Sequence, residues 1–98
     1  MKRSDLHLIK YALAGGNTIS VWDGEEWQVK RSTSYKAIKA AVDSVGDSTL
    51  RIRNSVGEEL ASAYIIPFNG SPDEYVSDYS YNDYMIAWDK LYMAEIMQ

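Results

Sequence analysis

Few side chains in this sequence could do chemistry, because it contains one histidine, His7, and no cysteine. The lack of cysteine excludes disulfides, thiol catalysis and cysteine-ligated zinc. His7 could act as a base only beside an activated serine, and there is no Gly-x-Ser-x-Gly turn to supply one. Gly15-Gly16 lacks the lysine and the spacing of a phosphate-binding loop. We therefore expect a non-enzymatic protein, with His7 on the surface or satisfied by internal hydrogen bonds.

Carboxylates gather late in the chain, at Asp73, Glu74, Asp78, Asp83 and Asp89. Such groups bind hard cations, but calcium loops place them at fixed offsets around a turn glycine. Here the offsets are irregular and tyrosines fill the gaps. A glycosidase-like pair of carboxylates would need a cleft, for which a chain of 98 residues leaves little room. We predict no metal site and no cofactor.

The same carboxylates alternate with tyrosines in the acidic half of the chain. Residues 1–53 hold nine Lys/Arg and six Asp/Glu, a net +3, whereas residues 54–98 hold one and eight, a net −7. Segregated charge creates a field that a partner can recognise, although acidic loops could also fall late by chance. The predicted partner-binding surface consists of Asp73, Glu74, Tyr75, Asp78, Tyr79, Asp83 and Tyr84. In one variant, these carboxylates imitate the phosphates of a nucleic acid.

An alternative site lies on predicted strands. Trp22, Lys30, Arg51 and Arg53 fall at outward positions, and an exposed sheet with an aromatic and basic residues resembles a platform for single-stranded nucleic acid. The simpler interpretation is that these are solvated outward positions, with Trp22 covering arginine stems.

The elements that must position these residues are those of a single α+β domain, residues 1–98. Ser4 can cap a helix that Gly15-Gly16 ends, and alternation predicts strands over 18–22, 27–30, 49–53 and 60–66. Further helices are predicted over 34–45 and 81–96. The order is α-β-β-α-β-β-α, with a four-stranded antiparallel sheet and helices packed on one face.

The two halves of this pattern resemble each other. Residues 4–30 and 34–66 both read as a helix, a glycine and a hairpin, and the loop and helix of 67–98 follow. This indicates an internal duplication, or else convergence of two units on one pattern.

The last predicted helix is apolar on more than one side. Its core stripe is predicted to comprise Tyr81, Met85, Trp88, Tyr92 and Ile96. The other apolar residues predict a second buried contact, as in a homodimer or a partner's groove, or a helix sunk deeply into its own fold.

Residues 21–33 (VWDGEEWQVKRST) and 78–84 (DYSYNDY) resemble segments of small uncharacterised accessory proteins of tailed bacteriophages and prophages. The resemblance implies a protein of the infected cell's cytoplasm that binds and modulates a host protein, and it carries over no catalytic residues. No apolar run approaches the roughly 20 residues of a membrane span, and no signal-peptide core follows the N-terminus. We expect a cytoplasmic protein with no membrane contact.

Overall fold

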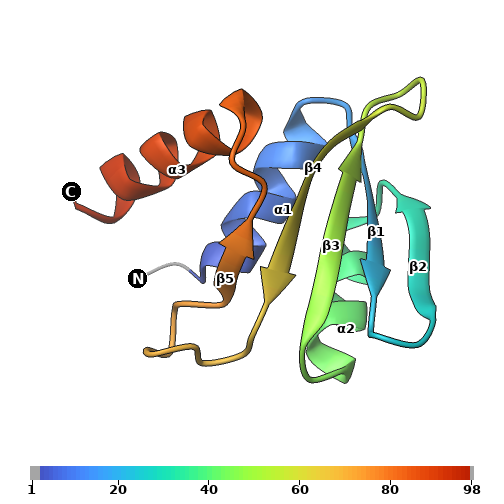
Figure 1. The fold of residues 1–98 in the computed structure, drawn as a ribbon, viewed down its shortest axis with the longest axis horizontal. Helices are drawn as coiled ribbons and strands as arrows, with labels where there is room; N and C mark the ends of the chain where they lie inside the picture. Colours follow the sequence, from blue (N-terminus) through green and yellow to red (C-terminus); the bar gives the residue numbers. More distant parts are fainter. Residues whose placement is uncertain (1–2, 98) are drawn as a thin grey trace.

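The computed structural model describes residues 3–97, which form three helices and one five-stranded antiparallel sheet (Figure 1). The helices are α1 (Ser4–Ala14), α2 (Tyr35–Ser44) and α3 (Asp83–Ile96), and the strands are β1 (Thr18–Trp22), β2 (Trp27–Ser32), β3 (Ser48–Arg53), β4 (Glu59–Ile65) and β5 (Val76–Tyr79). The strand order is β2-β1-β3-β4-β5. The predicted α+β class is confirmed.

The prediction of four strands is wrong, because β5 adds a fifth. This strand pairs with β4 through Ala63↔Tyr79 and Ile65↔Val76, with a register shift between these pairs. This register shift explains why the sequence pattern did not predict the strand. Val76 and Tyr79 both point to the core side, so the two residues between them break the alternation of period two that signals a strand.

One face of the sheet forms the core with the helices. Alternate residues of the central strands are buried there, and α1 and α2 cover them while α3 lies at the β5 end against α1 (Figure 1). The largest fully buried side chains include Trp88, Leu8, Ile9, Ile19, Ile38, Leu50, Ile52, Ile65 and Met85. The opposite face of the sheet carries no helix.

Ser4 does not cap α1 as predicted, because it is already the first helical residue and Arg3 stands at the N-cap. The Ser4 hydroxyl instead accepts hydrogen bonds from the backbone N–H groups of Tyr75 (3.0 Å) and Val76 (2.9 Å). The Ser4 N–H donates to the carbonyl of Asp73 at 2.9 Å. The start of α1 therefore holds the segment that leads into β5.

α3 also starts differently from the prediction, because it begins at Asp83 rather than at residue 81. The cap is Asn82, whose side chain accepts a hydrogen bond from the N–H of Met85 at 3.0 Å. Just before the helix, the Ser80 hydroxyl bonds the hydroxyl of Ser62 on β4. Tyr81 lies before the helix and is 91 % exposed, so its predicted place in the core stripe is wrong.

The two predicted helix-hairpin units lie side by side. β1 and β3 are antiparallel neighbours at the centre of the sheet, with the hairpin partners β2 and β4 outside them. Two copies related by an approximate two-fold axis would give this arrangement. Duplication itself stays a prediction.

Candidate functional site

The three tyrosines of the predicted partner-binding surface, Tyr75, Tyr79 and Tyr84, pack against other side chains rather than pointing toward a partner. Tyr75 is only 7 % exposed. The Tyr79 ring packs edge-on against Trp88, with centroids 6.0 Å apart, and the Tyr84 ring packs against Tyr11 at 5.6 Å. A buried ring offers no contact unless the segment opens. We therefore correct the predicted surface by removing Tyr75, and we assign Tyr79 and Tyr84 mainly to packing.

The acids of that segment remain at the surface but do not converge. Glu74 precedes β5, Asp78 lies within it, and Asp83 opens α3, so the three exposed carboxylates follow one another along the β5 edge. Asp73 is half-buried. Asp78 pairs with Tyr64 of β4 and so belongs to the outer face of the sheet. Among residues 3–97, no group of three or more acidic, histidine or cysteine side chains is placed to hold a metal ion.

The outer face of the sheet carries an aromatic row that crosses all five strands. The register places Trp27 beside Trp22, Trp22 beside Thr49, Thr49 beside Tyr64 and Tyr64 beside Asp78. We call these five residues the outer row. The two indole rings meet edge to face with centroids 5.0 Å apart, and Tyr64 is 41 % exposed. With strands about 4.8 Å apart, the row is roughly 19 Å long.

Acidic groups flank both ends of the outer row. The turn between the tryptophans carries Asp23, Glu25 and Glu26, and the backbone N–H groups of Glu26 and Glu25 lower the pKa of Asp23. At the other end, the Tyr64 hydroxyl donates to Asp47 at 3.2 Å. The charge of Asp47 raises the pKa of Tyr64, so this phenol stays neutral and acts as a donor.

The alternative nucleic-acid residues share this face, but two of the three cations are engaged. The Arg51 guanidinium lies 5.5 Å from the centroid of the Trp27 ring and forms an ion pair with Glu59 at 3.2 Å. Arg53 donates to a backbone carbonyl in the β3–β4 turn at 3.0 Å. Lys30 is exposed on the edge strand β2. Of these three positive charges, that of Arg51 is thus balanced by a carboxylate, whereas Arg53 is held by a neutral carbonyl.

A polar hollow of about 280 Å³ opens beside Tyr64. It is lined by Thr49, Ser62, Ala63, Tyr64, Asp78, Tyr79 and Ser80. Burial, followed by the charge of Asp89, raises the pKa of Tyr79, so its phenol also stays protonated. Hydroxyls around one exposed carboxylate can accept hydrogen bonds from an ammonium or guanidinium group.

His7 lies in a hydrogen-bonded chain between α1 and α3. The Trp88 indole donates to His7 Nδ1 at 3.0 Å, and His7 Nε2 contacts Glu95 at 2.8 Å. Because an indole can only donate, Nδ1 is the acceptor, and Nε2 carries the hydrogen and donates a hydrogen bond to Glu95. Both ring nitrogens therefore have structural partners, and His7 could take a proton from a substrate only by losing one of them.

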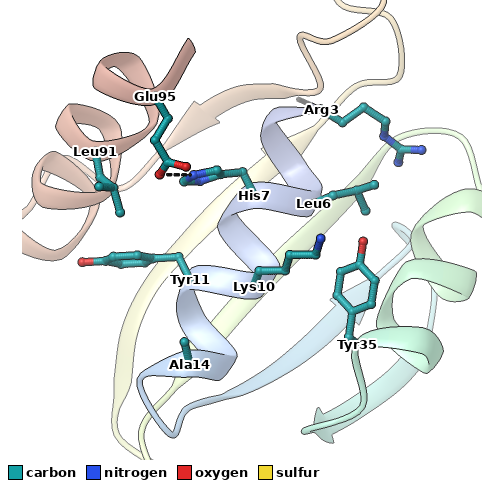
Figure 2. A pocket seen from close by; sticks show the side chains of 9 residues that line it. All are labelled: Arg3, Leu6, His7, Lys10, Tyr11, Ala14, Tyr35, Leu91 and Glu95. Carbon is teal, nitrogen blue, oxygen red and sulfur yellow. Dashed lines mark hydrogen bonds and ion pairs between the residues drawn. The ribbon is translucent and has the colours of Figure 1, made fainter. Parts of the chain in front are cut away.

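A groove of about 520 Å³ runs over α1 between α2 and α3 (Figure 2). It is lined by Arg3, Leu6, His7, Lys10, Tyr11, Ala14, Tyr35, Leu91 and Glu95. Apolar side chains make up most of this lining.

Sequence reasoning missed Trp27 and Tyr64 as surface residues. Both fall on predicted strands, and the alternation that places Trp22 outward does the same for Tyr64, which follows the buried Ala63. Predicting that Trp27 faces outward would have required the register of the β1–β2 hairpin, because its pairing with Trp22 brings the two indoles to one face.

The chain has no significant match to any protein-family model, to any curated protein or to any solved structure. None of the helices within residues 3–97 has the length and apolarity that a membrane crossing requires.

Proposed function

We propose that this chain is a non-enzymatic interaction module that binds a partner protein through the outer row of its sheet. The observation that carries the proposal is the row itself, in which two tryptophans and a tyrosine cross a face that bears no helix (Figure 1). Tryptophan and tyrosine are the residues that most often dominate binding energy at protein interfaces.

The charges around the row favour a partner segment with basic residues. Acids stand at both ends, and the chain carries a net charge of −4. A lysine or arginine can lie over an indole ring, and such contacts contribute about 0.5–2 kcal/mol each. The polar hollow beside Tyr64 and Asp78 then receives a second basic side chain.

This proposal keeps the acidic interaction surface predicted from the sequence but moves its centre. Asp78 remains in the contact, whereas Glu74 and Asp83 lie before and after it along the β5 edge. The likeness to phage accessory proteins supports a bacterial host protein as the partner. A nucleic-acid mimic would use the same face, because the protein groove that it occupies is also basic.

The proposal is tested by titrating ¹⁵N-labelled protein with pools of short basic peptides and with acidic pools of the same length. We expect basic peptides to shift the indole N–H signals of Trp22 and Trp27. Asp78→Lys should weaken this binding at least about tenfold, because it places a like charge in the contact. Asp83→Lys makes the same charge change outside the row and should leave the affinity unchanged.

Two results would refute the assignment. Equal shifts from acidic pools would show that charge does not select the partner. Equal losses of peptide affinity in Asp78→Lys and Asp83→Lys, with both variants folded by circular dichroism, would show that the whole β5 edge binds the peptide rather than the outer row.

A second candidate is binding of single-stranded nucleic acid on the same face. The placement of the Arg51 guanidinium over Trp27, on the strand that also carries Arg53, favours it, since stacked aromatics with nearby cations bind bases and phosphates. Binding of oligo(dT) that weakens steeply with salt and is lost in Arg51→Ala would support this function over the first. Absence of any shift with oligo(dT) at low salt would remove it.

A further inference from the structure

The Trp27 ring of the outer row is already in contact with a cation of the same chain. The Arg51 guanidinium carbon lies 5.5 Å from the centroid of this ring, within the distance at which an indole attracts a cation. The register of the sheet explains the contact, because Trp27 and Thr49 both lie beside Trp22, and Arg51 follows Thr49 by two residues on the same face of β3. Arg51 is therefore an internal occupant of the outer row.

This internal occupant is held weakly. Arg51 Nε is buried and makes no hydrogen bond within residues 3–97, although Glu59 Oε1 lies 3.2 Å from it in an ion pair. The two side chains of the pair are 39 % and 46 % exposed, and ion pairs at such positions contribute little to stability. A buried donor without an aligned acceptor also costs free energy. A second guanidinium can therefore replace that of Arg51 at low cost.

Arg53 shows that this contact is not shared by every arginine of the strand. It lies two residues after Arg51 on the same face of β3, and its guanidinium donates to the carbonyl of Gly57 at 3.0 Å. Within residues 3–97, the contacts between a cation and an aromatic ring do not include Arg53. Arg53 therefore offers a control for Arg51 with the same charge, on the same strand and away from the tryptophans.

We infer that the Trp27 ring is a binding site for an arginine of the partner protein, and that this arginine displaces Arg51. The inference rests on the proposed function, because it takes the outer row as the contact surface and adds the type of residue that is recognised. A guanidinium is planar and delocalised, so it stacks on an indole better than the compact, strongly hydrated ammonium of lysine. Arg51 marks the position that the partner's arginine takes.

The charges around Trp27 favour this exchange. The turn that precedes Trp27 carries Asp23, Glu25 and Glu26, so an incoming guanidinium meets carboxylates as it reaches the ring. Glu59 stays beside Arg51 and balances its charge after it leaves the ring. Competition from Arg51 should thus weaken the binding of the partner without preventing it.

Two short peptides that alternate glycine with arginine or with lysine test the inference, by titration into ¹⁵N-labelled full-length protein. We expect the arginine peptide to shift the indole N–H signal of Trp27 and to bind at least about threefold more tightly than the lysine peptide. This comparison uses the wild type and needs no variant.

Arg51→Lys tests the competition, because it keeps the charge but removes the planar guanidinium from Trp27. This variant should bind the arginine peptide at least about threefold more tightly than wild type does. Arg53→Lys makes the same change away from the tryptophans and should bind like wild type. Circular dichroism checks that both variants are folded.

The outcomes separate this inference from the proposed function. Equal affinities for the two peptides would overturn the recognition of arginine. Unchanged or weaker binding in Arg51→Lys, or equal gains in Arg51→Lys and Arg53→Lys, would overturn the competition at Trp27. In each of these cases the proposed function stands as long as the peptides shift the signals of the outer row. If neither peptide shifts them, both the inference and the proposed function are wrong.

Discussion

Arg3 and Asp5 form an ion pair in which the two partners are buried to very different degrees, and this asymmetry makes a testable prediction. The Asp5 carboxylate is fully buried and accepts bonds from Arg3 at 3.1 and 2.8 Å. The Arg3 side chain is 21 % exposed and also bonds Asp43 at 2.9 Å. The bond to Asp5 raises the pKa of Arg3, which stays charged throughout.

Removing Arg3 should therefore cost more than removing Asp5. Arg3→Met replaces the guanidinium, whose carbon lies 4.0 Å from the centroid of the Tyr75 ring, with an uncharged side chain. It leaves the buried Asp5 carboxylate without its partner, at about 3–5 kcal/mol. Asp5→Ala leaves a guanidinium that retains Asp43 and water, at about 1–2 kcal/mol. Replacing both, as Arg3→Met with Asp5→Leu, should cost less than the sum of the two single changes, because no buried charge is then left unpaired.

Urea denaturation followed by circular dichroism measures these three costs. A domain of this size has about 5–15 kcal/mol of stability, so Arg3→Met should lower the midpoint by a large fraction while the protein remains folded in water. If Asp5→Ala proved the more damaging change, or if the costs were strictly additive, burial of Asp5 would not be the source of the asymmetry.

Three further predictions concern single contacts. Burial raises the pKa of Asp43, but hydrogen bonds from Lys39 and Arg3 outweigh it and lower that pKa below its usual value. The Asp43 carboxylate therefore stabilises the fold above about pH 4, and this effect is lost as the pH falls through the pKa of Asp43 in the folded protein. The stability deficit of Asp43→Asn should accordingly shrink between pH 7 and pH 3 in urea melts. Ser4→Ala removes the acceptor of two backbone N–H groups before β5, so the amides of Tyr75 and Val76 should exchange at least tenfold faster by NMR, with a stability loss of about 1–3 kcal/mol. Trp88→Phe removes the donor to His7 Nδ1, so the ¹⁵N signals of the imidazole should move toward a mixture of tautomers, and unchanged signals would contradict the assignment.

Sequence patterns predicted the elements with strong periodicity and local caps. The strand over 18–22 is found with the predicted bounds, and α2 begins after Ser34, whose hydroxyl accepts the Ala37 N–H at 3.1 Å. The sequence did not predict β5, because this strand has only four residues and its pairing with β4 contains a register shift. The backbone that leads into it is also held by Ser4, which lies 71 residues from Tyr75. Local patterns do not encode a contact of that separation, and tertiary context decides such a strand.

The candidate site was predictable only in part, because residue type does not determine which way a side chain points. Trp22 was expected to face outward, and its pairing with Trp27 and Thr49 places it in the outer row. Tyr75 and Tyr79 were expected at a contact surface, yet they face Arg3 and Trp88. A bulge reverses the facing of the residues that follow it, so their orientation depends on a register that the sequence leaves open.

Composition gives a physical reason why the tyrosines turned inward. The chain has one phenylalanine but eight tyrosines and three tryptophans, and a domain of 98 residues must bury large side chains to stay folded. Tyrosines on α1, β5 and α3 therefore seal the core, with their hydroxyl ends near polar groups, as the bond from Asn17 to the Tyr84 hydroxyl illustrates. An acidic tyrosine-rich segment in a small domain can thus be a core-closing segment whose acids face water. Two exposed aromatic residues, Phe68 and Tyr81, lie in loops, whereas Trp22, Trp27 and Tyr64 gather on the sheet face without a helix. For this reason the outer row, rather than the acidic segment as a whole, is the better candidate for binding a partner.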